Sequence, residues 1–164
     1  MTLLDDFLTI VLAWQDNCKE REVAMPASRI ESLADIMGLE LRGPADIVYR
    51  VRKGLSPGVS RRITEAYGVS QEDLARIIHV STKTIQKQKA EGAYNTKVSD
   101  GLVRLADVFA RATEVFEDKA EARAWLQEES IALGGVAPWS LLDTSTGSDM
   151  VVRELGKIEH GIVS

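Results

Sequence analysis

The chain has 164 residues, of which 45% are hydrophobic and 27% are charged. This is enough for one helical domain of good size or for two small ones. No apolar run approaches the roughly 20 residues that a membrane-spanning helix needs, and the apolar start is acidic where a secretion signal would be basic. The lone Cys18 gives no disulfide framework and agrees with a reducing compartment. We therefore expect a cytoplasmic protein.

Charge is unevenly distributed along the chain. Residues 1–40 hold three basic and eight acidic side chains, residues 41–99 hold eleven and five, and residues 100–164 hold six and twelve. The segment charges are thus −5, +6 and −6. A basic centre is the electrostatic footprint of a nucleic-acid-binding region, and acidic flanks should face away from DNA or contact something else.

Hydrophobic periodicity and capping residues predict helices along the whole chain. Ser28 with Glu31 forms a capping box for the second helix. Asn95 or Thr96 caps a long helix, and Asp118 caps the next one. No stretch alternates as a strand would, so the predicted fold class is all-α. Helices are predicted over residues 2–17, 28–37, 44–53 and 57–67, as two short helices within 70–92, and over 96–117, 119–128, 138–142 and 145–158.

The stretch Ser70–Gly92 is typical of a helix-turn-helix. Ser70 can cap the first short helix and Ser81 the second, while apolar residues between them can fill the angle of two crossed helices. The turn holds His79 where Gly is common, and His tolerates the left-handed backbone better than most residues. A solvated amphipathic hairpin is the alternative. The side chains predicted to reach phosphates and base edges are Gln71, Thr82, Lys83, Gln86, Lys87 and Lys89.

Residues 131–164 differ in kind, because they are rich in glycine and hold Trp139 among several aliphatic residues. Such a piece suits close approach of backbones. It can be a subdomain that completes the core or a module that contacts a partner protein. At its end Gly161 permits a change of direction, after which Ile162 and Val163 can enter a partner's cleft or fold back on their own helix.

Four short motifs in the last third carry a resemblance to a known family. They are A-x-x-W-L at 122–126, A-L-G-G at 132–135, P-x-x-L-L-D-T at 138–144 and L-G-x-I-x-x-G at 155–161. With them and its helix-turn-helix, the chain from about Met37 onward resembles the Xre/MbcA/ParS-like antitoxins, the partners of toxins with the RES domain. The first 36 residues have no counterpart in the family.

The resemblance implies an antitoxin that inhibits a RES-type toxin, which consumes NAD or transfers groups from it, and that represses its own operon by binding operator DNA. The chemistry belongs to the toxin, so no cofactor, metal or catalytic residue is expected here. The implied parts are an N-terminal helical segment with a possible role in dimerisation (1–40), a helix-turn-helix domain (41–117) and a toxin-binding domain (118–164). With the tail, the predicted toxin contacts are Leu133, Gly134, Gly135, Pro138, Trp139, Leu141, Leu142, His160, Gly161, Ile162 and Val163.

Two other classes of function compete with this one. The chain could be a stand-alone transcription regulator with a small-molecule C-terminal domain. An enzyme is disfavoured by the sequence, which holds no metal-ligand cluster, no nucleophile with a base nearby and no Gly-rich phosphate loop. Because a two-fold DNA reader needs two copies, a homodimer is predicted. The apolar faces of 2–17 and 98–116 are candidate interfaces, although both can equally belong to the monomer core.

Overall fold

The computed structural model describes residues 25–161. The helix predicted over 2–17 and the tail residues Ile162 and Val163 lie outside them. The described part contains nine α-helices and one 3-10 turn, and its only β-type pairing is an isolated bridge between Ser130 and Val136, which confirms the all-α class. No helix in this part is both long and apolar enough to cross a membrane. The elements are α2 (Ala27–Met37), α3 (Pro44–Lys53), α4 (Pro57–Tyr67), α5 (Gln71–Ile77), α6 (Thr82–Glu91), α7 (Thr96–Phe116), α8 (Lys119–Gln127), η1 (Ile131–Leu133), α9 (Pro138–Leu141) and α10 (Ser145–Glu159).

Most predicted caps are confirmed, and one is wrong. The side chains of Asn95 and Asp118 accept hydrogen bonds from the first turns of α7 and α8. The capping box expected at Ser28 does not form, because α2 begins at Ala27 and its N-cap position is Pro26, two residues earlier. The carbonyl of Pro26 already accepts the first N–H groups, from Arg29 at 2.9 Å and Ile30 at 3.2 Å. The residue expected to cap α2 therefore lies inside its first turn.

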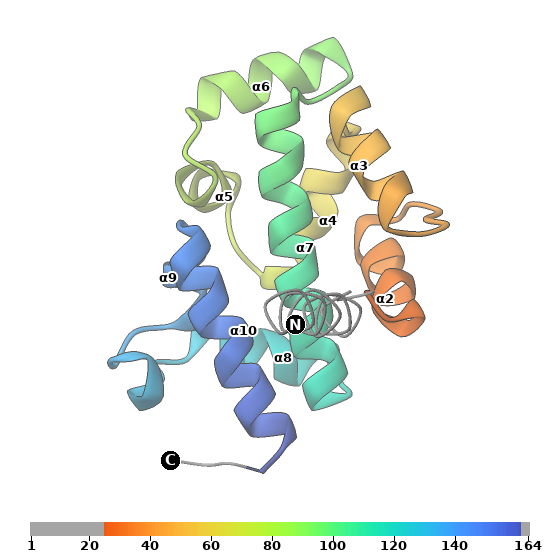
Figure 1. The fold of residues 1–164 in the computed structure, drawn as a ribbon. Coiled ribbons are helices and arrows are strands. Elements are labelled where there is room, and N and C mark those ends of the chain that lie inside the picture. The colour runs from red at the N-terminus through yellow and green to blue at the C-terminus, as the bar shows by residue number, and fades with distance from the viewer. Residues whose placement is uncertain (1–24, 162–164) are drawn as a thin grey trace, which may run out of the picture.

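Helix α7 is the centre of the fold (Figure 1). The other helices gather around it, and α2, α3, α4, α8 and α10 all contact it. Its apolar stripe, which includes Val98, Leu102, Leu105 and Phe109, is almost completely buried within the single chain. The face of 98–116 that was a candidate dimer interface is therefore monomer core.

An aromatic cluster joins three elements that are distant in sequence. The fully buried ring of Tyr67 on α4 lies 5.0 Å from Phe109 on α7 and 4.6 Å from Trp139 on α9, measured between ring centroids. Its hydroxyl donates a 2.8 Å hydrogen bond to the carbonyl of Leu105. Burial, and to a lesser degree the charge of Asp107, raises the pKa of Tyr67, so the phenol stays neutral.

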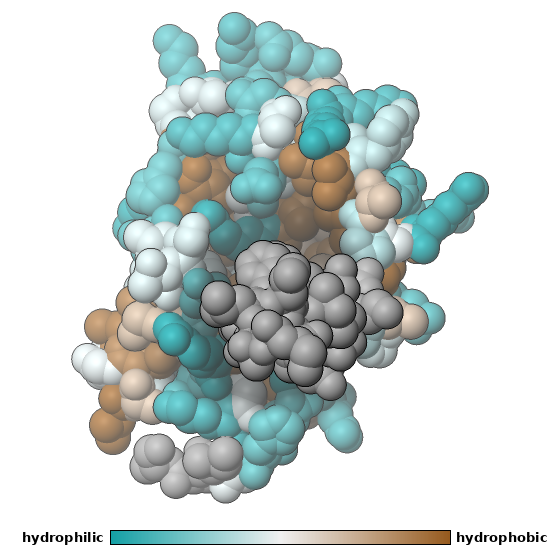
Figure 2. Space-filling view, in the orientation of Figure 1, coloured by the Kyte–Doolittle hydropathy of each residue, from teal (hydrophilic) through white to brown (hydrophobic). Residues whose placement is uncertain are grey.

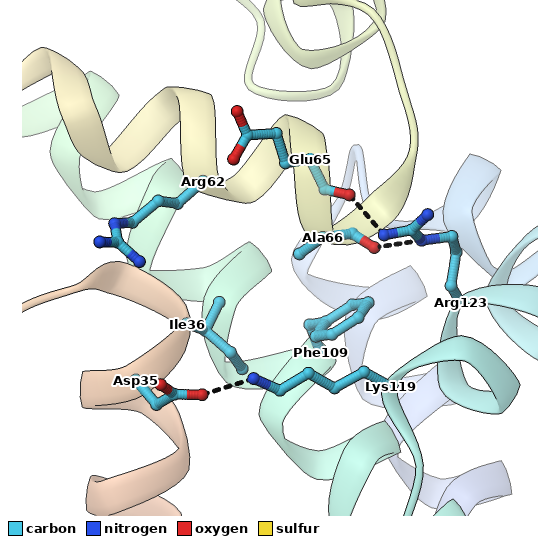
Figure 3. Close-up of a pocket in the computed structure, with 8 residues that line it drawn as sticks. All are labelled: Asp35, Ile36, Arg62, Glu65, Ala66, Phe109, Lys119 and Arg123. Atoms are coloured by element: carbon cyan, nitrogen blue, oxygen red, sulfur yellow. Dashed lines mark hydrogen bonds and ion pairs between the residues drawn. The ribbon is translucent and has the colours of Figure 1, made fainter.

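Helix α8 closes the C-terminal end of α4. Arg123 donates hydrogen bonds of 2.7 and 2.6 Å to the carbonyls of Ala66 and Glu65, and Gln127 donates one to the carbonyl of Tyr67. The last carbonyls of a helix have no partner within the helix, so these bonds satisfy groups that would otherwise need water. Figure 3 shows Arg123 reaching α4 from α8 at the rim of a hollow. The C-terminal part of the chain thus completes a helix of the central part.

Two glycines of α10 test how closely this helix is packed. A Cβ at Gly147 would lie 1.9 Å from the carbonyl oxygen of Leu141, whereas a Cβ at Gly156 would meet nothing within 4 Å. We expect Gly147→Ala to lower the free energy of unfolding by about 1–3 kcal/mol through overpacking. Gly156→Ala should raise it by about 0.5–1 kcal/mol, because alanine loses less backbone entropy in a helix. Urea denaturation followed by circular dichroism measures both, and equal midpoints for the two variants would contradict the packing described here.

Candidate functional sites

Helices α5 and α6 and the turn between them form the predicted helix-turn-helix. His79 in the turn has a φ of 53°, so it adopts the left-handed conformation that the sequence predicted. The turn presses against α7 at Gly101, where a Cβ would lie only 2.8 Å from the side chain of Ile78. Glycine at this position therefore lets the turn pack closely against α7. The apolar side chains of the helix-turn-helix are buried, namely Leu74, Ile77, Ile78 and Ile85.

The first turns of both short helices are fixed by serine caps. Ser70 and Asp73 form a capping box at the start of α5, and the Ser81 hydroxyl accepts a 3.0 Å bond from the N–H of Thr84 in α6. The pKa of Asp73 is lowered mainly by the hydrogen bond that its carboxylate accepts from the Ser70 hydroxyl. The neighbouring Arg76 lowers this pKa by a smaller amount. Both helices thus begin at defined residues, which fixes the direction of their outward side chains.

The structure brings the predicted DNA-binding residues together on one face. Gln71 is half-buried and donates a 3.3 Å hydrogen bond to the hydroxyl of Thr64, while the other five are exposed on α6. Lys87 lies 3.8 Å from Glu91, whereas Lys83 and Lys89 have no carboxylate within 4 Å in the described part of the chain. Figure 2 shows the hydrophilic surface that covers α6 at the top of the molecule. Thr82, Gln86 and Lys89 line a hollow of about 220 Å³ with Gln71.

The turn of the helix-turn-helix also contacts the C-terminal part of the chain, a contact that the sequence did not predict. The Nε2 atom of His79 donates to the backbone carbonyl of Asp143 over 2.8 Å. The carbonyl of His79 in turn accepts a 3.3 Å bond from Lys97. His79 therefore has two roles, since its backbone forms the turn and its side chain joins that turn to the segment between α9 and α10.

The predicted toxin contacts lie at different depths. Leu133, Pro138 and Leu142 are buried, and Trp139 and Leu141 are half-buried. In this arrangement the three buried side chains pack the domain rather than line its surface. Whether any of these residues contacts a toxin stays a prediction. Those that are exposed are Gly134, Gly135, His160 and Gly161.

Exposed apolar side chains mark a surface that sequence reasoning missed. Ile131 in η1 is 95% exposed, and Val136 at the other end of the same small loop is 38% exposed. The bridge between Ser130 and Val136 holds this loop closed. Figure 2 shows apolar surface at the lower left, where Figure 1 places the segment between α8 and α9. The sequence shows an isoleucine directly before the A-L-G-G motif, but it does not show that this side chain is exposed, because the tertiary fold decides its exposure.

The hollow drawn in Figure 3 lies where four helices meet. It measures about 250 Å³ and is lined by side chains from α2, α4, α7 and α8. Lys119 of α8 forms an ion pair with Asp35 of α2, and Arg123 is bonded to carbonyls of α4. These charged groups are thus already engaged in holding helices together.

Two family models match the two halves of this structure. The model described as the antitoxin Xre-like helix-turn-helix domain matches residues 46–107. The model described as the antitoxin Xre/MbcA/ParS C-terminal toxin-binding domain matches residues 111–161. The chain belongs to the Xre-like antitoxins. The antitoxin therefore carries one domain whose type implies DNA binding and another that implies a toxin partner.

Relatives of the antitoxin agree with this assignment. It is 29% identical to Antitoxin Xre of Photorhabdus laumondii over 70% of this chain and 78% of that protein. It is 26% identical to Antitoxin Xre of Yersinia enterocolitica over 85% and 95% of the two chains. It is also 28% identical to a Sphingobium protein named Prs ADP-ribosylating antitoxin, over 72% and 80%. The prediction that the chain is an antitoxin and not an enzyme is confirmed by its family.

Proposed function

We propose that this antitoxin binds and inhibits a RES-type, NAD-consuming toxin in the cytoplasm, and that as a homodimer it represses its own operon. We divide the work between residues 41–117, which bind operator DNA, and residues 118–164, which bind the toxin. The observation that carries the proposal is the presence of two separate unpartnered surfaces, a basic one on α6 and an apolar one around Ile131. The name of the Sphingobium relative includes ADP-ribosylation, a reaction that consumes NAD.

The DNA-binding proposal is supported by the direction of side chains on α6. Ile85 and Gln88 face inward, where Gln88 accepts a 2.8 Å hydrogen bond from the N–H of Asn95. The opposite side of the helix presents lysine, glutamine and threonine to solvent. Lysine neutralises phosphates and glutamine can pair with adenine edges, so this face has the chemistry of major-groove recognition.

Charge reversal on α6 tests the DNA-binding role. Lys83→Glu with Lys87→Glu should abolish binding to the duplex upstream of the gene, because two phosphate-directed cations become repulsive anions. A mobility-shift assay at moderate salt measures this, and Arg153→Glu on the exposed side of α10 is the control that should still bind. Unchanged binding by the double variant, with wild-type circular dichroism, would remove α6 as the recognition helix.

The toxin-binding proposal is supported by the unusual exposure of Ile131. A monomer gains nothing from a fully exposed isoleucine, whereas a partner that covers it removes apolar surface from water. The loop is anchored, since Leu133 within it and Pro138 after it are buried, and the bridge between Ser130 and Val136 closes it. An exposed apolar side chain on an anchored loop loses little entropy on binding, which suits the centre of an interface.

Substitution of this side chain tests the toxin surface. Ile131→Asp should weaken toxin binding roughly 10- to 100-fold, because burial of one isoleucine is worth about 1.5–3 kcal/mol. Titration calorimetry with the purified toxin gives the affinity, and residual NAD consumption in a mixed assay should rise. Val48→Asp removes an exposed apolar side chain from α3 and should neutralise normally. Full-affinity binding by Ile131→Asp would place the toxin elsewhere on the domain.

The homodimer proposal is supported by the two-fold symmetry that paired half-sites on DNA require. Because the apolar stripe of α7 is buried in the monomer core, any dimer interface must use other surfaces. We expect light scattering at micromolar concentration, without toxin or DNA, to give the mass of two chains. A monomeric mass would contradict this part of the proposal and leave the other two parts standing.

A further inference from the structure

The end of α3 holds a second group of cations outside the helix-turn-helix. Its last turn contains Arg50, Arg52 and Lys53. Arg50 is engaged, since it pairs with Asp46 at 3.3 Å and donates a 2.6 Å hydrogen bond to the carbonyl of Glu40. Arg52 and Lys53 are exposed and have no carboxylate within 4 Å among residues 25–161. Two charges are therefore available to a partner at this end of the helix.

The loop that follows α3 is attached to the loop that follows the recognition helix. The N–H of Tyr94 donates a 2.9 Å bond to the carbonyl of Leu55, whose own N–H donates a 3.0 Å bond to the hydroxyl of Ser99. At Gly54, with a φ of 95°, a Cβ would lie 2.4 Å from the carbonyl oxygen of Tyr94. Only glycine allows this approach. The hydroxyls of Ser60 and Tyr94 also share a buried 2.7 Å hydrogen bond.

These contacts fix the end of α3 beside the end of α6. Figure 1 shows α3 rising toward the connection between α6 and α7 at the top of the molecule, where the outer face of α6 also lies. A duplex that receives α6 in its major groove continues past both ends of that helix, with its phosphates flanking the groove. The cations of α3 therefore lie at one end of the recognition helix, in the region where a flanking strand would run.

We propose that Arg52 and Lys53 form a phosphate-binding extension of the DNA surface, outside the helix-turn-helix itself. The inference rests on the DNA-binding part of the proposed function. Its partner is the duplex backbone, because two exposed cations near the end of α6 can neutralise phosphates and offer no pattern for reading bases. The Lys53 ammonium lies 5.9 Å from the centroid of the Tyr49 ring, which is 61% exposed, so this cation is held close to the surface of α3.

A purely structural role is the competing explanation. Cations in the last turn of a helix interact favourably with its dipole, whatever else they do. That role predicts a change in unfolding midpoint and no change in DNA binding. A phosphate-binding role predicts instead that loss of these cations flattens the salt dependence of DNA binding and weakens the affinity for every DNA sequence equally.

The test measures affinity for the upstream duplex and for a scrambled duplex of equal length, by fluorescence anisotropy between about 50 and 200 mM salt. For Arg52→Ala with Lys53→Ala, we expect the log–log salt slope to fall by about two units per bound chain. Both duplexes should weaken by the same factor, because phosphate contacts carry no sequence information. Arg153→Ala, an exposed arginine of α10, is the control that should keep the wild-type slope.

Each outcome separates the inference from the function on which it rests. A wild-type slope for the double variant of α3, while Lys83→Glu with Lys87→Glu abolishes binding, overturns the inference and keeps the helix-turn-helix. Weakening confined to the upstream duplex also overturns it, since that would indicate base reading. Failure of the wild-type chain to bind either duplex would overturn the DNA-binding function itself. Circular dichroism of the α3 variant confirms that the exposed substitutions leave the helices intact.

Discussion

The burial of one helix is the constraint on which the rest of the structure depends. Helix α7 contributes an apolar stripe to the helices before it and another contact surface to α8 and α10 after it. The two family matches meet between residues 107 and 111, inside this helix. The antitoxin therefore has two domains by sequence but one hydrophobic core by packing. Neither half can bury its apolar surface without the helix that the other half also uses.

Contacts outside the core strengthen this union and fix the position of the DNA-binding face. The Tyr67 ring is packed between α7 and α9, and Arg123 of α8 satisfies carbonyls of α4. His79 joins the turn of the helix-turn-helix to Asp143. Aromatic packing and satisfied carbonyls are costly to break, so α6 has a defined orientation relative to the C-terminal domain.

The charges of the molecule are divided by role. In the C-terminal part, some cations are paired with carboxylates, as in Arg111 with Glu159 and Lys157 with Glu154. On the basic face, Lys83, Arg52 and Lys53 have no such partner within the described residues. Exposed ion pairs contribute only about 0–1 kcal/mol each, so leaving these cations unpaired costs the fold little. Their value lies in the counterions that they can release from a polyanion.

The sequence by itself determined the local features of this protein. Four helices start directly after capping residues whose hydroxyl, amide or carboxylate oxygens accept hydrogen bonds from N–H groups two or three residues on. These residues are Ser70, Ser81, Asn95 and Asp118. The left-handed turn at His79 and the all-α class are also local or periodic properties. Even there one cap failed, because the carbonyl of Pro26 took the role expected of Ser28.

Only the tertiary structure decided which apolar residues face water and which cations stand together. Leu142 and Ile131 look alike in the sequence, yet one is completely buried and the other almost completely exposed. The pairing of Leu55 with Tyr94, which carries α3 to the end of α6, joins residues 39 positions apart. Such contacts depend on how whole helices pack around α7. Hydrophobic burial has no direction of its own, so the pattern of one segment cannot state which partner will cover it.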